Sequence, residues 1–298
     1  MLPFHGAEPV GPSKPFSEAL FTSWTHIEWI PLVGVIAMAS WYLLAVRSLR
    51  RRGDAWPVGR TLAYVGGGLG TLVVATQGPL AEYDTTLLSV HMVQHMLISM
   101  VAPIFLALGA PITLALRTFM PALRKALLAV LHSGYAKVVT FPIVAGAIAI
   151  ANPWTLYFTP LYELTLRNPW LHNLNHMHFL VVGCVWTFAL IGIDPMPRVG
   201  YPLRMLAVFL TMPFHAFLGI TIMGQQEVIA GDWYHDLGRS WGASPAEDQA
   251  LAGGMLWAAG EVVALMILIA LFVQWSRASA REAKRIDRAL DRAEAAGE

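Results

Sequence analysis

Ten histidines are the residues of this 298-residue chain best suited to chemistry. Four of them form two pairs with i,i+4 spacing, His91/His95 and His172/His176. Residues four apart lie one turn apart on the same face of a helix, so each pair can offer two imidazoles to one metal ion. His215 lies in a third apolar segment, at a depth similar to that expected for His95. We therefore expect these five histidines to converge on a metal.

Methionines accompany the first histidine pair. Met92, Met96 and Met100 follow one another at i,i+4 spacing. Thioether and imidazole ligands together suit copper, especially Cu(I), better than hard cations, which prefer carboxylate and carbonyl oxygens. Methionine is also an ordinary packing residue, so the series favours copper among the metals without establishing a site. The predicted metal ligands are His91, His95, His172, His176, His215, Met92 and Met96.

Glu261 lies in the middle of the last apolar segment, with no basic residue near it in the sequence. An ionisable group inside a membrane is costly and is a functional candidate. Either a proton relay or a hydrogen bond to a metal-bound histidine would explain it; a purely structural hydrogen bond is the alternative. His26 and His178 are weaker candidates, since a lone membrane histidine is more often a hydrogen-bonded packing residue.

The composition defines the elements that must position these side chains. Apolar residues make up 56% of the chain, charged residues 13%, and the mean hydropathy is +0.54. Soluble domains carry about 25% charged residues, so the chain is predicted to be an integral membrane protein. A helix needs roughly 20 apolar residues to cross a hydrocarbon core of about 30 Å. Seven such segments predict an all-α, polytopic transmembrane helical bundle, with spans at 25–46, 61–80, 87–110, 138–158, 173–193, 203–224 and 250–275.

The basic residues predict the orientation, because Lys and Arg concentrate in cytoplasmic loops. With the N-terminus outside and the C-terminus cytoplasmic, 17 of the 20 basic residues fall inside. Those inside are Arg47, Arg50, Arg51, Arg52, Arg60, Arg117, Arg124, Lys125, Lys137, Arg198, Arg204, Arg277, Arg281, Lys284, Arg285, Arg288 and Arg292, and those outside are Lys14, Arg167 and Arg239. The predicted regions are an external segment (1–24), a membrane domain (25–275) and a cytoplasmic charged helical tail (276–298).

This topology separates the histidines by side. Both pairs and His215 fall in the outer half of the membrane, His5 falls in the external segment, and only His132 is clearly on the inner side. The single cysteine, Cys184, excludes a disulfide or a cysteine-only metal site within one chain. The first 23 residues lack a leading basic stretch, so we expect the first span to be an uncleaved anchor.

Four stretches carry a family resemblance. They are HMVQHMLISMVAPIFLALGAP (91–111), PWLHNLNHMHFLVVGCVW (169–186), DPMPR (194–198) and WGASPAEDQALAGGMLWAAGE (241–261). In this order they resemble the membrane-integral CtaG family, assembly factors for caa3-type cytochrome c oxidase. The resemblance covers about residues 25–275. By motif matching it assigns functional roles to His91, His95, His172, His176, His215 and Glu261.

The resemblance implies a non-catalytic role in maturing a haem-copper terminal oxidase, with copper as the cofactor. It also implies residence in the bacterial cytoplasmic membrane, in contact with membrane lipid. The expected partner is a cytochrome c oxidase subunit; a copper donor protein and a second copy of the chain are further candidates, and nucleic acid is not.

Two other functions remain open from the residues. A copper transporter of the inner membrane would use the same ligands, together with inner-side ligands such as His132 or Cys184. A membrane b-type haem protein would use histidines from two facing helices at matched depth.

Overall fold

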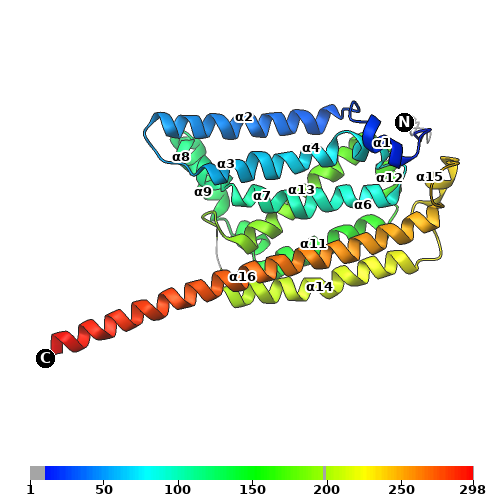
Figure 1. Ribbon diagram of the computed structural model, residues 1–298. Coiled ribbons are helices and arrows are strands. Elements are labelled where there is room, and N and C mark those ends of the chain that lie inside the picture. The colour runs from blue at the N-terminus through cyan, green and yellow to red at the C-terminus, as the bar shows by residue number, and fades with distance from the viewer. Residues whose placement is uncertain (1–10, 197–198, 298) are drawn as a thin grey trace.

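The computed structural model describes residues 11–196 and 199–297, and this part of the chain contains helices and no strand. The long helices lie side by side in one bundle, and the last of them extends far beyond it (Figure 1). His5, Pro197 and Arg198, which entered the predictions above, lie outside the described residues. The all-α, multi-pass fold is confirmed.

Within the described residues, six helical segments are long and apolar enough to cross a membrane. Two of them contain π-helical stretches, η1 and η2, in which backbone hydrogen bonds join residues i and i+5. The segments are α2 (Trp29–Arg51), α3–η1–α4–α5 (Val58–Thr61, Leu62–Leu69, Gly70–Thr76 and Pro79–Tyr83), α6–η2–α7 (Leu88–Met96, Leu97–Val101 and Ala102–Leu108), α13 (Pro169–Ile191), α14 (Tyr201–Gly224) and α16 (Pro245–Gly297).

The expected fourth span, 138–158, is represented by α11 (Pro142–Tyr157), which contacts both α13 and α14. Its 16 residues extend about 24 Å at 1.5 Å per residue, short of a hydrocarbon core of about 30 Å. The helix is short because α10 (Gly134–Val139) ends at Thr140 and a new helix starts at Pro142. Seven spans and the N-out orientation therefore stay predictions.

Shorter helices cover the two ends of the bundle (Figure 1). Near the N-terminus lie α1 (Phe16–Thr22), α12 (Leu161–Arg167) and α15 (Gly231–Asp236); α8 (Pro111–Thr118) and α9 (Pro121–Leu131) lie at the opposite end. The predicted helical tail is a direct continuation of α16, which runs for 53 residues, or about 80 Å. The side of the membrane on which the tail lies stays a prediction.

Helix α13 approaches the third segment very closely at Gly183. A Cβ at this position would overlap the carbonyl group of Ser99 in η2, so only glycine permits the contact. Helices α14 and α16 cross in the same way, because a Cβ on Gly253 would lie 2.6 Å from the carbonyl oxygen of Gly219. Small residues at crossings let membrane helices pack backbone to backbone. The first crossing brings together the two helices that carry the histidine pairs.

Two carboxylates from the recognised motifs fix helix ends. Asp194 accepts hydrogen bonds from the backbone nitrogens of Ile112 (3.2 Å) and Thr113 (2.7 Å), and thereby caps α8. Asp248, in the first turn of α16, accepts from both the backbone nitrogen and the hydroxyl of Ser89. This second contact fixes the start of α6, two residues before His91.

Candidate metal centre

Helices α6 and α13 bring their histidine pairs into one buried cluster. The ring centroids of His91 and His95 lie 3.9 Å apart, and those of His172 and His176 lie 4.4 Å apart. Between the helices, His91 faces His172 and His95 faces His176, each at 5.6 Å. The exposed fractions of these side chains are between 0 and 8%. The predicted convergence of the two pairs is therefore present in the structure.

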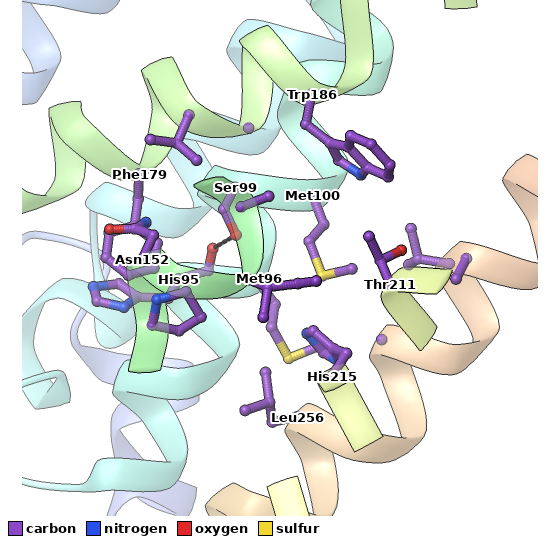
Figure 2. A pocket seen from close by; sticks show the side chains of 18 of the residues that line it. His95, Met96, Ser99, Met100, Asn152, Phe179, Trp186, Thr211, His215 and Leu256 are labelled. Atoms are coloured by element: carbon purple, nitrogen blue, oxygen red, sulfur yellow. Dashed lines mark hydrogen bonds between the residues drawn. The ribbon is translucent and has the colours of Figure 1, made fainter. Parts of the chain in front are cut away.

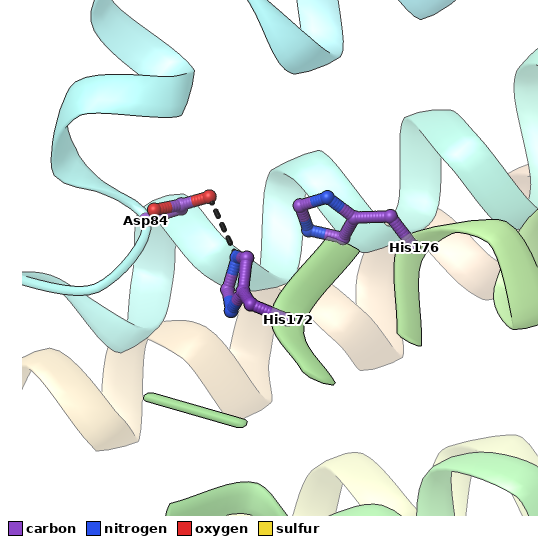
Figure 3. A group of neighbouring side chains, drawn as sticks. All are labelled: Asp84, His172 and His176. Carbon is purple, nitrogen blue, oxygen red and sulfur yellow. Dashed lines mark hydrogen bonds and ion pairs between the residues drawn. The ribbon is translucent and has the colours of Figure 1, made fainter. Parts of the chain in front are cut away.

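Asp84, which the sequence reasoning missed, also belongs to this cluster. Its Oδ2 atom lies 3.0 Å from Nε2 of His172, and ligand atoms of Asp84, His172 and His176 all lie within 4.8 Å of one another (Figure 3). Asp84 lies in the connection between α5 and α6. The signal was available: only six residues separate the second and third predicted spans, so an acidic residue there must lie near the first histidine pair.

Several ring nitrogens in the cluster are buried without a hydrogen-bond partner among the described residues. They are Nδ1 and Nε2 of His91, Nδ1 of His172 and Nε2 of His176. Asp84 also approaches His91 through its backbone, but neither ring nitrogen completes a hydrogen bond. Most buried polar atoms in proteins are paired, and an orphaned group calls for an explanation such as an ion. Each neutral imidazole has one lone pair, so His91, His172 and His176 can each offer one of these nitrogens to a metal.

Asp84 determines which nitrogen of His172 is free. A carboxylate only accepts hydrogen bonds, so Nε2 of His172 carries a proton, and in the neutral ring Nδ1 carries the lone pair. Nδ1 is one of the unpartnered atoms. This arrangement matches the carboxylate–histidine–metal triads in which an outer carboxylate orients the ligand ring.

A second chain of contacts orients His95. Its Nδ1 lies 3.1 Å from the hydroxyl of Tyr157, and that hydroxyl lies 3.7 Å from the sulfur of Met92. With the hydroxyl donating to Met92, it accepts from Nδ1, and the lone pair of His95 is on Nε2. Nε2 has only a distant neighbour, the amide of Asn175 at 3.4 Å. Met92 thus accepts a hydrogen bond from Tyr157, which in turn contacts the ring of His95.

Two tyrosines close the cluster at the N-terminal end of the bundle. The ring of Tyr162 lies 4.8 Å from that of His91, and its hydroxyl lies 2.6 Å from the hydroxyl of Tyr234. Burial raises the pKa of both phenols, so both stay neutral. These side chains therefore border the cluster with polar but uncharged groups.

The remaining predicted residues lie elsewhere. His215 makes no ring contact with the four clustered histidines; it lines a separate cavity with His95 and Met96 (Figure 2). Glu261 lines the same cavity. The structure therefore joins four of the five expected histidines and separates the fifth.

Residues 40–278 match the family described as cytochrome c oxidase caa3 assembly factor. The chain belongs to this family. An uncharacterized protein of Mycobacterium bovis is 38% identical over 288 residues, which are 94% of this chain and 43% of the relative. Uncharacterized proteins of Mycobacterium tuberculosis and Mycobacterium leprae are 38% and 34% identical over the same length. The chain thus spans less than half the length of these relatives. No solved structure matches it.

The match to the caa3 assembly factor family spans all four stretches that carried the resemblance. The cluster histidines come from two of the recognised stretches, and Asp194 and Asp248, which fix helix ends, come from the other two. His178, the weaker candidate on α13, is exposed. The family match confirms the resemblance seen in the sequence.

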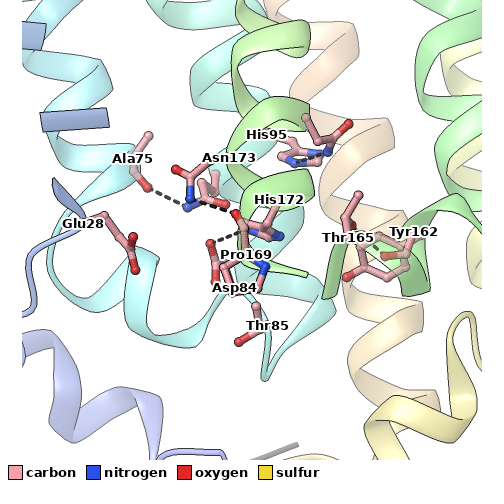
Figure 4. A network of polar contacts seen from close by, with 12 residues as sticks. Glu28, Ala75, Asp84, Thr85, His95, Tyr162, Thr165, Pro169, His172 and Asn173 are labelled. Atoms are coloured by element: carbon pink, nitrogen blue, oxygen red, sulfur yellow. Dashed lines mark hydrogen bonds and ion pairs between the residues drawn. The ribbon is translucent and has the colours of Figure 1, made fainter. Parts of the chain in front are cut away.

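A polar cavity of about 200 Å³ leads into the cluster of this family member. Its walls include His26, Glu28, Glu82, Asp84 and His172. The His26 ring is half-buried and lies 3.3 Å from the Glu28 carboxylate, and Figure 4 shows Glu28 and Asp84 on the same side of His172. His26 thus belongs to the approach to the cluster. Carboxylates along this path would attract cations.

Proposed function

We propose that the chain assists assembly of a haem-copper terminal oxidase by holding copper at the four-histidine cluster and delivering it to an oxidase subunit. The observation that carries this proposal is the set of four unpartnered ring nitrogens in the buried contact between α6 and α13. Membership of the caa3 assembly factor family supports the oxidase as the recipient. The role is non-catalytic, in the bacterial cytoplasmic membrane.

The chemistry of the cluster favours copper in its monovalent state. Neutral imidazoles bind copper well, and Asp84 supplies one negative charge beside them. A buried site in a low-dielectric medium penalises uncompensated charge. One monovalent cation with one carboxylate is neutral overall, whereas a divalent cation leaves a net positive charge. Cu(I) is therefore the better match.

The polar cavity beside Glu28 and Asp84 provides access. It extends from His172 and His176 to His26 and Glu28, just before α2. Helices α1 and α15 lie at this end of the bundle (Figure 1). In the predicted orientation this end faces outward, on the side where copper would pass to or from a partner protein. A copper donor protein and a second copy of the chain remain candidate partners.

The alternatives fit the arrangement less well. A b-type haem needs a planar slot between its two histidines, but the four rings lie directly against one another, with centroids no more than 5.6 Å apart across the two helices. A transporter needs ligands toward the other end of the bundle as well. Cys184, inside α13, packs against the apolar core, and His132 is exposed at the end of α9.

Metal analysis of the purified chain in lipid nanodiscs tests the proposal. The wild-type protein is expected to retain Cu(I) at the cluster, and the variant His176→Ala is expected to lose that ion. His178→Ala is the matched control, because His178 is an exposed histidine on the same helix. Equal copper content in all three proteins, or none in the wild type, would overturn the copper proposal.

A deletion strain separates assembly from transport. Loss of oxidase activity with unchanged cellular copper is the expected result. Altered cellular copper with an oxidase that is fully active would instead support transport.

A further inference from the structure

The cavity that holds His215 has donor chemistry different from that of the histidine cluster. It has a volume of about 110 Å³ and lies among the third segment, α11, α13, α14 and α16. A single water needs about 10–15 Å³ of such space, so an ion and several waters fit. The imidazole, thioether and carboxylate side chains of its lining are those of His95, Met92, Met96, Met100, Met212, His215 and Glu261.

Two polar atoms of this cavity are buried without a partner in the described part of the chain. They are Nδ1 of His215, on α14, and Oε1 of Glu261, on α16. Methionines packed in a core need no such explanation, but an orphaned imidazole nitrogen and an orphaned carboxylate oxygen in one cavity do. A bound cation would satisfy both.

Close packing holds the His215 ring in place. A Cβ added at Gly260 would overlap the Cε1 and Nδ1 atoms of that ring. The ring therefore lies directly on the backbone of α16, one residue before Glu261. Glycine at this position is what allows the imidazole and the carboxylate to share the cavity.

The thioethers approach from the third segment. Figure 2 shows the sulfur of Met96 beside the His215 ring, with Met100 pointing into the same space. The π-helical stretch η2 begins directly after Met96, and the hydroxyl of Ser99 donates to the carbonyl of His95 at 2.7 Å. Such stretches are rare and are frequent at functional sites. Here the stretch changes the rotation of the helix between His95 and Met100.

We propose that this cavity is a second metal site, selective for a soft monovalent cation such as Cu(I), with Met96 and His215 as its central ligands. Met100 and Met212 supply further thioethers, and Glu261 balances the charge. Thioether sulfur selects Cu(I) over harder ions. The site differs from the histidine cluster in offering sulfur.

His95 connects the two sites. Its ring contacts those of His91 and His176 in the cluster, at 3.9 and 5.6 Å, and it also lines the cavity of Met96 and His215. An ion leaving the cluster can therefore reach the thioethers by exchanging ligands at one residue. This relay step rests on the proposed function, whereas the existence of the second site does not.

Silver(I) is a suitable probe, because it is a soft monovalent ion that does not change oxidation state under these conditions. The full chain in nanodiscs is titrated with Ag(I), and its X-ray absorption spectrum is recorded for sulfur neighbours. The wild type is expected to bind one ion at each site, with sulfur scattering from the second. Met96→Leu conserves volume and is expected to weaken the second site by about tenfold or more and to reduce the sulfur signal.

Gly260→Ala tests the geometry without removing a ligand. It is expected to displace the His215 ring and to abolish the second site, whereas Gly254→Ala on the same helix meets its nearest atom only at 3.8 Å and should bind like the wild type. Sulfur scattering unchanged in both Met96→Leu and Gly260→Ala would overturn the second site.

His176→Ala distinguishes the two proposals. If silver is bound only through sulfur, in the wild type and in His176→Ala alike, the second site is supported and the metal site at the histidine cluster is overturned. Silver bound only through nitrogen in the wild type, and lost in His176→Ala, would overturn the second site and leave the proposed function intact. Absence of bound silver would overturn the second site.

Discussion

Oδ2 of Asp84 lies 3.0 Å from Nε2 of His172, although 88 residues separate the two in the chain. The contact joins the connection before α6 to the first turn of α13. It also selects the tautomer of His172 that leaves Nδ1 free. An outer carboxylate of this kind raises the basicity of the ligand ring and fixes its direction.

Replacing Asp84 with asparagine should weaken copper binding at the cluster by about 10- to 100-fold, since outer partners of ligand histidines have effects of that size. Competition with a Cu(I) chelator measures the change. Glu82→Gln is the control, because Glu82 lines the same cavity but is only half-buried. Equal affinities of Asp84→Asn and Glu82→Gln would contradict the orienting role of Asp84.

Replacing Glu28 with glutamine should slow copper capture and leave the final occupancy unchanged. Charges along an approach path act mainly on association rates. The side-chain amide of Gln77 hydrogen-bonds both the N–H and the carbonyl of Glu28, so the backbone at this position should not move in the variant. Stopped-flow binding at low and high salt measures the effect, which should shrink as salt rises.

The matched control for Glu28 is Glu18→Gln, which removes an exposed carboxylate on α1. If both variants bind copper at the wild-type rate, the polar cavity is not the route into the cluster.

Replacing Gly183 with alanine should destabilise the protein by about 1–3 kcal/mol, the usual cost of overpacking, because the added methyl group must push α13 away from Ser99. It should also weaken copper binding, since the same displacement separates the two histidine pairs. Thermal unfolding in nanodiscs and chelator competition check the two effects.

Gly34→Ala provides the comparison for Gly183, because a Cβ at position 34 of α2 meets no atom within 4 Å. That variant should be unchanged or slightly stabilised, by up to about 1 kcal/mol. An equally mild effect of Gly183→Ala would show that the contact between α13 and Ser99 does not require glycine.

The predicted orientation can be tested with single cysteines in a Cys184→Ser background. Ser17→Cys and Ser279→Cys lie at exposed positions of α1 and α16. In intact cells a membrane-impermeant maleimide should label position 17 only, and position 279 should react after lysis. The reverse pattern would place the histidine cluster on the cytoplasmic side.

The sequence was sufficient for the parts of the fold that depend on local pattern. Helical periodicity placed His91 with His95 and His172 with His176, and hydropathy located the long helices. It could not show that the two pairs face each other, because this depends on the rotation of α6 and α13 about their axes. Nor could it separate His215 from the others, since a depth estimate leaves that rotation undetermined.

Two further differences have local causes. The π-helical stretch at residues 97–101 lies in an evenly apolar run, which gives no sign of the extra residue. The break before Pro142 shortens the expected fourth span, although the apolar run continues through it. Asp84 was missed although the short connection between the second and third predicted spans pointed to it, because the prediction relied on helical periodicity, which does not extend into a connection.

The close contact at Gly183 has a consequence for release. Within each pair the distance between imidazoles is set by the helical pitch, which is stiff. Between the pairs it is set by the separation of two helix axes, which meet there without an intervening side chain. A partner that moved α13 slightly away from α6 would widen the proposed coordination sphere without breaking a backbone hydrogen bond of either helix. The affinity for the ion and the docking of the recipient would then both depend on the distance between these two helices.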